Sequence, residues 1–345
     1  MKSAKAIRTP GGLSLRFDPR SAVVVLLLAV AAAAAGVVLI GSGDFPIAPG
    51  EVIATLLGNG TPAQEFIVQD LRLPRVLVGL LVGASLALSG AIFQSISRNP
   101  LGSPDVIGFG QGATVGALSV IVLFNGGALA VAGGAIVGGL VTGVAVYLLA
   151  WKRGVHGYRL VLVGVGVAAM LTAAIHFLVT KANLVEATQA TLWMTGSLDG
   201  RDWAQVWPLL AVFVVLVPPV LVHARPLRML EMGDDAAYAL GAPVERTRVV
   251  LMGSGVLLMA VATAAAGPIA FVALSAPQLA RRLTRSPGPN LTAATVMGGA
   301  LLLVADWIAT TAFGDRELPV GVVTGVLGGG YLLWLLVTER KAGRI

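Results

Sequence analysis

The sequence predicts an all-α integral membrane protein that crosses a lipid bilayer about ten times. Hydrophobic residues make up 56% of the 345 residues and charged residues only 12%, whereas soluble domains carry about 25% charged residues. The apolar residues form runs near the length of about 20 residues that spans a hydrocarbon core. Most cations lie at the ends of alternate runs. These observations leave little chain for a soluble domain, so residues 1–345 are interpreted as a single transmembrane domain.

Charged or Gly/Pro-rich breaks divide the chain into ten predicted spans. They lie near 22–41, 73–94, 105–124, 128–150, 159–180, 205–222, 248–267, 268–281, 291–311 and 318–337. The first run is longer than the apolar segment of about 7–15 residues in a secretory signal, so it is kept as a span after a tail of residues 1–21. The eighth is short and follows directly on Gly267-Pro268, which favours a tilted or broken helix buried in the bundle.

The distribution of lysine and arginine predicts the orientation. Of 24 such residues, 19 lie at connections on one side of the predicted membrane and five on the other. By the positive-inside rule the first side is cytoplasmic, and both termini lie there. With five spans in each half, the second half starts from the opposite side of the membrane, as in an inverted repeat.

Several function classes are disfavoured by what the sequence lacks. The +7 charge lies at span ends rather than in a nucleic-acid-binding stretch, and zero cysteines exclude disulfides and thiolate metal sites. No G-x-x-x-x-G-K-[ST], H-E-x-x-H or G-x-S-x-G pattern occurs, so the sequence offers no catalytic or metal residues and no ATP site. A secondary transporter is the main alternative class. It would need several ionisable groups inside spans, and the sequence offers mainly Asp306, with His176 near a span end.

Many of the 44 glycines recur at four-residue spacing, which lets helix backbones approach closely in lipid. Tight internal packing is the expected use. The triplet Gly321, Gly325 and Gly329 is the best candidate for a subunit interface or pathway lining.

The longest cytoplasmic connection, residues 225–247, predicts a compact helix–turn–helix outside the membrane. Asp234 can cap a short helix over residues 235–240, Gly241 can end it, and Pro243 suits the first turn of the next helix. The short helix is rich in alanine, which favours docking of its apolar face into another protein; a self-packed loop is the alternative.

At this segment the chain resembles the permeases of iron–siderophore and vitamin B12 ABC importers (FecCD type). The resemblance extends over nearly the full chain. The motif that begins at Arg98 is most similar to that of permeases for catecholate siderophores such as ferric enterobactin. The matching motifs are Gly233-Asp-Asp-Ala-Ala-Tyr-Ala-Leu240-Gly241, Arg72-Leu-Pro-Arg75, Arg98-Asn-Pro-Leu-Gly-Ser-Pro-Asp-Val-Ile-Gly-Phe-Gly110, Trp193-Met-Thr-Gly196, Gly267-Pro-Ile-Ala-Phe271, Ala305-Asp306 and Glu317-Leu-Pro-Val-Gly321.

The resemblance implies residue roles at both faces of the membrane. Arg72 and Arg75 would meet acidic residues of an external binding protein; anchoring to lipid headgroups is the alternative. A third family arginine falls on Thr310, and Arg316 is expected to replace it. The ATPase-coupling segment would comprise Gly233, Asp234, Asp235, Ala236, Ala237, Leu240 and Gly241.

A cytoplasmic gate is implied at Asn99, Pro100 and Leu101, with Tyr158 near a second gate loop. A purely structural role is an equal alternative for the first loop and the favoured one for Tyr158. Asp306 is expected to be a hydrogen-bonded structural acid.

The resemblance further implies a multi-pass subunit of a bacterial inner membrane that is not itself an enzyme. It would pair with a paralogous permease subunit, two ATPase subunits that hold ATP and Mg²⁺, and an extracytoplasmic siderophore-binding protein. The chain itself would bind no cofactor. The sequence leaves open which siderophore, haem or cobalamin is carried, and heterodimer against homodimer.

Overall fold

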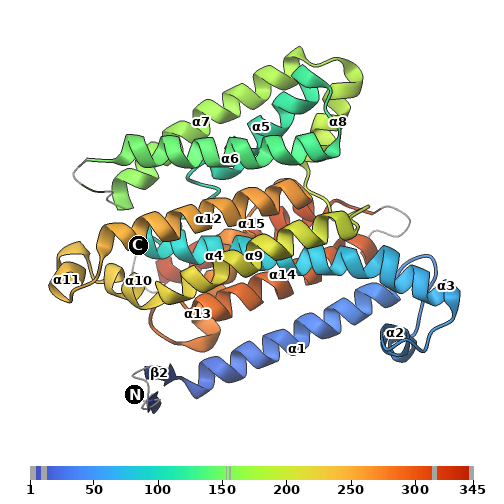
Figure 1. Cartoon of the computed structure of the whole chain (residues 1–345), viewed down its shortest axis with the longest axis horizontal. Helices are drawn as coiled ribbons and strands as arrows, with labels where there is room; N and C mark the ends of the chain where they lie inside the picture. The colour runs from blue at the N-terminus through green and yellow to red at the C-terminus, as the bar shows by residue number, and fades with distance from the viewer. Residues whose placement is uncertain (1–4, 9–13, 153, 155–156, 313–316, 342–345) are drawn as a thin grey trace.

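The computed structural model describes residues 5–8, 14–152, 154, 157–312 and 317–341, and they fold mainly into long helices that run side by side (Figure 1). The helices are α1 (Pro19–Gly41), α2 (Pro49–Leu56), α3 (Pro62–Glu65), the π-helix η1 (Phe66–Arg72), α4 (Leu73–Ser97), α5 (Phe109–Phe124), α6 (Ala128–Ala150), α7 (Gly157–Lys181), α8 (Leu184–Met194), α9 (Trp203–Val222), α10 (Ala224–Glu231), α11 (Asp234–Ala239), α12 (Val244–Ala266), α13 (Val272–Thr284), α14 (Leu291–Thr311) and α15 (Val320–Lys341).

The amino-terminal tail departs from the all-α expectation. Strands β1 (Lys5–Arg8) and β2 (Ser14–Phe17) pair antiparallel, with Lys5 opposite Phe17 and Arg8 opposite Ser14. The correction is local, because the rest of the described chain is helical or connects helices.

Seven helices of the described chain are long and apolar enough to cross a membrane: α1, the continuous helix over Pro62–Ser97, α6, α7, α9, α12 and α14. Two shorter apolar helices, Phe109–Phe124 and Val320–Leu335, accompany them. With α13, these helices coincide with the ten predicted runs. The inverted repeat stays a prediction.

The predicted break after the seventh run is confirmed. Helix α12 ends at Ala266, Gly267 takes φ +75°, and Phe271 takes φ 69° before α13 begins. Positive φ at a phenylalanine is unfavourable in an ordinary helix, so residues 267–271 form a sharp non-helical link. Most of α13 is buried, as expected for a broken helix inside the bundle.

Helix α4 is the centre of the fold and is buried along most of its length. Glycines let its neighbours approach: a Cβ added to Gly83 would lie 2.3 Å from the Gly298 carbonyl oxygen of α14, and one on Gly90 would lie 1.8 Å from the Ala273 carbonyl oxygen of α13. The glycine spacing therefore marks internal packing, as expected.

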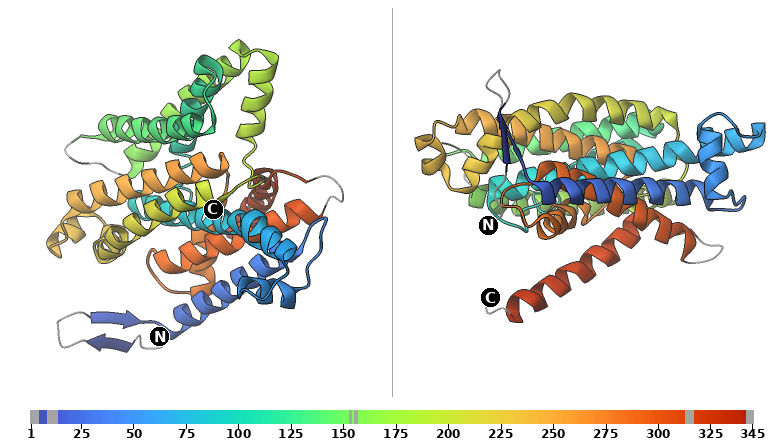
Figure 2. Two further views of the ribbon diagram at one scale, coloured as in Figure 1. Left: turned by 45° about the vertical axis from the view of Figure 1, so that its right-hand side comes forward. Right: turned by 90° about the horizontal axis from the view of Figure 1, so that it is seen from below.

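Helices α5 and α6 meet in the same way, whereas α15 makes such close contacts only at Gly321 and Gly328 among its described glycines. A Cβ on Gly116 would lie 2.0 Å from the Gly134 carbonyl oxygen. In α15, Gly321 lies against Thr195, whereas Gly325 and Gly329 have open space around them among the described residues. Figure 2 shows α15 leaning away from the other helices towards its carboxyl end.

The two ends of the bundle carry different small helices. Helices α10 and α11 lie at the end from which α1 starts, and α2, α3 and α8 lie at the opposite end (Figure 1). We call these the α10–α11 end and the α2–α3 end.

We expect Gly83→Ala to destabilise the protein by about 1–3 kcal/mol, because the added methyl group must push α4 and α14 apart. Gly133→Ala in α6 is the matched control, since a Cβ there meets nothing within 4 Å. Thermal unfolding of the two purified variants measures the difference. Equal midpoints would contradict close α4–α14 packing.

Candidate functional site

The α2–α3 end holds the predicted arginine pair on one continuous helix. The π-helix η1 ends at Arg72, and α4 begins at the next residue with Pro74 in its first turn. π-helical turns are rare and recur at functional sites. Arg72 donates from Nη1 to the Ile40 carbonyl (2.7 Å) and from Nη2 to the Phe45 carbonyl (3.0 Å). Its guanidinium thus holds the chain leaving α1.

Arg75 forms a two-pronged ion pair with Asp306 of α14. Nε lies 3.1 Å from Oδ2 and Nη2 lies 3.0 Å from Oδ1. The Asp306 side chain is 1% exposed and that of Arg75 is 20% exposed. Such a fork satisfies a carboxylate geometrically as well as electrostatically, so Asp306 is bonded as the structural interpretation expects.

Two further carboxylates surround the free edge of Arg75. Nη1 lies 3.4 Å from Glu317 Oε2 and 3.8 Å from Asp199 Oδ1. Arg75 therefore joins α4 to α14, to the residues before α15 and to the connection before α9. Its fork, expected to be offered to a partner, is already occupied within this chain.

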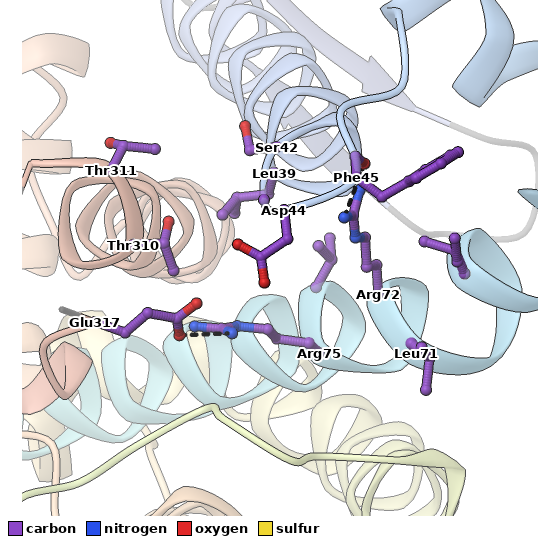
Figure 3. A pocket seen from close by; sticks show the side chains of 13 residues that line it. Leu39, Ser42, Asp44, Phe45, Leu71, Arg72, Arg75, Thr310, Thr311 and Glu317 are labelled. Atoms are coloured by element: carbon purple, nitrogen blue, oxygen red, sulfur yellow. Dashed lines mark hydrogen bonds and ion pairs between the residues drawn. The ribbon is translucent and has the colours of Figure 1, made fainter. Parts of the chain in front are cut away.

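A cavity of about 340 Å³ lies beside this cluster. Figure 3 shows Asp44 and Glu317 on the side to which Arg75 points, with Arg72 farther along the same helix. Thr310 also lines the cavity, and its hydroxyl donates to the Asp306 carbonyl at 3.1 Å. Arg316, the expected third arginine, lies outside the described residues.

The connection before α9 is also charged. Arg201 donates from Nε to the Ser197 carbonyl at 3.3 Å. Burial lowers the pKa of Arg201, while Asp199 and Asp202 act in the raising direction. The guanidinium of Arg201 stays charged in spite of the burial, because the pKa of arginine lies far above neutral pH.

At the α10–α11 end, the short helix forms with different caps from those expected. Gly233, with φ 113°, is the N-cap residue of α11, and Asp234 lies in the first turn. Gly241 follows the helix with φ +77°, as its predicted role as terminator requires. Pro243 is the N-cap of α12 rather than a residue of its first turn. Only glycine adopts φ 113° without strain, which explains why the cap falls at Gly233.

Asp234 is used in an ion pair that fastens α11 to α12. Arg248 Nη2 lies 2.6 Å from Asp234 Oδ1, and Nη1 lies 3.3 Å from Glu245 Oε1. The Arg248 side chain is 3% exposed. From the sequence, Arg248 was interpreted only as a basic residue at the end of a span, and this ion pair was not predicted. The separation of 14 positions between Asp234 and Arg248 gives no sign that the two side chains meet.

The α11 surface is apolar on its open side. Met232, Tyr238 and Leu240 are 61%, 55% and 57% exposed, whereas Ala237 is fully enclosed by this chain. From the sequence, Ala237 was placed in the ATPase-coupling segment, but a direct contact of its methyl group with a partner is corrected by the fold, in which this methyl group is buried within the chain. Asp235 is exposed and Gly233, Asp234 and Ala236 are partly exposed, so the open surface is the rim around Ala237.

The predicted gate residues lie in the connection between α4 and α5. The Asn99 side chain accepts from the Leu101 amide (2.9 Å), and the Gln278 side chain donates to the Pro100 carbonyl (2.6 Å). Leu101 and Tyr158 are exposed. A Cβ on Gly157 would lie 2.8 Å from Ser97 Cα, so the start of α7, which carries Tyr158, abuts the end of α4. The structure thus brings both segments that were predicted to form a gate to one region, and the gate itself stays a prediction.

No group of three or more His, Cys, Asp or Glu residues in the described parts of the chain could hold a metal ion.

The FecCD transport family model matches residues 22–338. The chain is 47% identical over 306 residues to the ferric enterobactin transport system permease protein FepG of Escherichia coli K12, covering 89% of this chain and 93% of that one. It is 35% identical to the vitamin B12 import system permease protein BtuC of Escherichia coli O9:H4, over 81% and 86% of the two chains.

A solved structure has the same fold. It shows an inward-facing conformation of a transporter described as a metal-chelate type ABC transporter, with TM-score 0.81 and 26% identity, covering 92% of this chain and 99% of that one.

We expect Arg75→Ala to destabilise the protein by about 3–5 kcal/mol, because it leaves the Asp306 carboxylate buried without a partner. The double variant Arg75→Ala/Asp306→Ala should recover much of this loss. Thermal unfolding of the single and double variants forms a double-mutant cycle. Additive losses would contradict the pairing.

Proposed function

Because this chain belongs to the FecCD transport family, we propose that it is the permease subunit of an ATP-driven importer of iron–siderophore complexes. The observation that carries the proposal is 47% identity over most of the chain to a ferric enterobactin permease. A second relative, the iron(3+)-hydroxamate import permease FhuG of Bacillus subtilis 168, is 36% identical. The shared cargo class is a ferric chelate, and the higher identity favours a catecholate chelate.

The proposed subunit crosses the membrane ten times. The seven long apolar helices supply seven crossings, and α5, α13 and α15 supply the others, as shorter or broken helices packed in the bundle. The α10–α11 end and both termini are proposed to lie in the cytoplasm, which the excess of lysine and arginine at the corresponding connections supports. In a bacterium this membrane is the inner one.

The ATPase partner is proposed to dock on the α10–α11 end. Met232, Tyr238 and Leu240 form an apolar surface that water does not favour. The Arg248–Asp234 ion pair makes α11 move with α12, so a push on this surface is delivered to a membrane helix. Gly233 and Gly241 set the angle of α11 at its two ends.

The binding protein is proposed to dock on the α2–α3 end. Arg72 and Arg75 supply positive charge beside an open cavity, and acidic groups of a partner would compete with Glu317 and Asp199 for the outer edge of Arg75. Arg316, two residues before Leu318 in sequence, stays a candidate for the third contact. Asn99, Pro100, Leu101 and Tyr158 are proposed to close the opposite end of the pathway.

The proposed cycle is alternating access between two permease subunits. Closure of two ATPases moves the α11 surfaces, and the pathway between a pair of permeases opens to one side and then the other. The second permease is proposed to be a paralogous chain. Gly325 and Gly329, with open space around them, offer close approach to a neighbouring helix.

The function is tested by reconstituting the chain with its partner subunits in lipid. Binding protein loaded with a ferric catecholate should stimulate ATP hydrolysis more than unloaded protein or protein loaded with ferric hydroxamate, haem or cobalamin. Equal rates with every cargo, together with no uptake of labelled iron, would overturn the proposal.

Leu240→Arg should weaken ATPase binding at least tenfold and leave the permease folded. The long charged side chain would be buried in the proposed interface, which costs several kcal/mol, and about 1.4 kcal/mol is tenfold in affinity. Leu57→Arg is the control, because Leu57 is also an exposed leucine but lies at the α2–α3 end. Co-purification of ATPase with each variant measures the effect. Undiminished binding with Leu240→Arg would remove α11 from the interface.

A further inference from the structure

The connection from α4 to α5 passes through the interior of the bundle. A Cβ on Gly164 would lie 2.7 Å from the Ile107 side chain, and one on Gly110 would lie 3.0 Å from Met259. Gly164 and Met259 are interior positions of the long apolar helices α7 and α12. At a rise of about 1.5 Å per residue, Gly164 is roughly 10 Å from the start of α7. Asp105 is therefore a carboxylic acid level with apolar helix interiors.

A cavity of about 370 Å³ lies beside Asp105. Its polar wall comes from the start of α5 and includes Gln111 and Thr114. The rest of its lining includes Thr195, the non-helical stretch 268–270 and Gly321 of α15. Non-helical backbone at membrane depth is tolerated where it is buried in protein or lines a water-filled cavity.

Two side-chain oxygens at this cavity lack a hydrogen-bond donor among the described residues: Asp105 Oδ2 and Gln111 Oε1. Both atoms are enclosed, although each residue as a whole is partly exposed. Thr114 does not supply one, because its hydroxyl donates to the Gly110 carbonyl at 2.9 Å. Asp105 is the one ionisable side chain among the described residues that line the cavity, so no lysine, arginine or histidine there balances a negative charge.

An ionised carboxylate in such a place is strongly disfavoured, because burial without a partner penalises the charged form. A protonated carboxyl group differs in having one O–H donor. Since Gln111 Oε1 is an acceptor without a donor at the same cavity, one proton on Asp105 changes two unmatched acceptors into a donor and an acceptor.

We propose that Asp105 is a proton-binding site within the bundle and carries a proton in this conformation. The other charged groups described above lie away from it: Asp306 is neutralised by Arg75 at the α2–α3 end, and Asp234 by Arg248 at the α10–α11 end. Neither lines the Asp105 cavity.

Proton binding then depends on the conformation of the cavity. Water entering between α5 and residues 268–270 would solvate the carboxylate and release the proton. By linkage, a conformation that releases a proton gains population as pH rises. The sign is therefore fixed: acid favours the conformation that shields the carboxyl group, and alkali favours the conformation in which water reaches it.

The test uses the full chain with its partner subunits in lipid nanodiscs. Infrared difference spectra between mildly acidic and mildly alkaline pH should show the carbonyl band of a protonated carboxylic acid. Asp105→Asn should remove that band, and Asp105→Glu should retain it at a shifted frequency. Asp199→Asn, at an exposed acid, should leave it unchanged.

A second measurement keeps the test valid where the substitution at residue 105 also changes the packing around it. Basal ATP hydrolysis of the complex should change with pH, and Asp105→Asn, a neutral side chain of the same shape, should flatten that change. A band that persists in Asp105→Asn overturns the proposal. So does a band that sodium or potassium removes at constant pH, since the neutralising group would then be a metal cation.

Discussion

The structure depends on close backbone contact between α4 and the helices around it. In lipid, apolar burial supplies little drive for helix association, so the packing energy comes from backbones that approach one another. Gly83 and Gly90 let α14 and α13 lie against α4 at distances that no larger residue allows. This contact puts the arginine of α4 beside the acid of α14 and holds the short, broken α13 within the bundle. The positions of the residues at both ends of the bundle therefore depend on the packing of α4 against α13 and α14.

Helix positions were readable from the sequence because membrane helices obey a length rule and a charge rule that need no knowledge of tertiary structure. The ten apolar runs each contain a helix, and the break at Gly267-Pro268 was legible because both residues punctuate helices. The strand pair before α1 was not predicted, although Leu13-Ser14-Leu15-Arg16-Phe17 alternates apolar and polar residues after Pro10-Gly11-Gly12. That signal is short, and the tail was assigned by its cations alone. Nor was η1 predicted, because a π-helix differs from an α-helix only in hydrogen-bond register.

Side-chain partners were much less predictable than helices. The sequence suggested that Arg75 faces outward and that the Ala237 methyl group meets a partner, whereas the fold pairs Arg75 with Asp306, 231 positions away, and encloses Ala237. The spacing of a motif can indicate that a residue has a role, but it does not indicate which side chain that residue contacts. The same holds for Arg248. From the sequence, a basic residue at a helix end is interpreted as a membrane anchor, and only the fold shows that it pairs with Asp234.

Helix α12 connects the two features that a moving permease would need. Arg248 near its first turn is fixed to α11, and its last residue precedes the non-helical link that lines the Asp105 cavity. Between them, Met259 touches the start of α5 at Gly110. A helix is stiff along its axis because each turn is hydrogen-bonded to the next, so displacement at α11 reaches residues 267–271 with little loss. The link itself has two residues with positive φ, and the helical hydrogen bonds of the described chain reach only its two end residues, Gly267 and Phe271. It is therefore the place in this path where axial motion is most easily converted into a change of cavity shape.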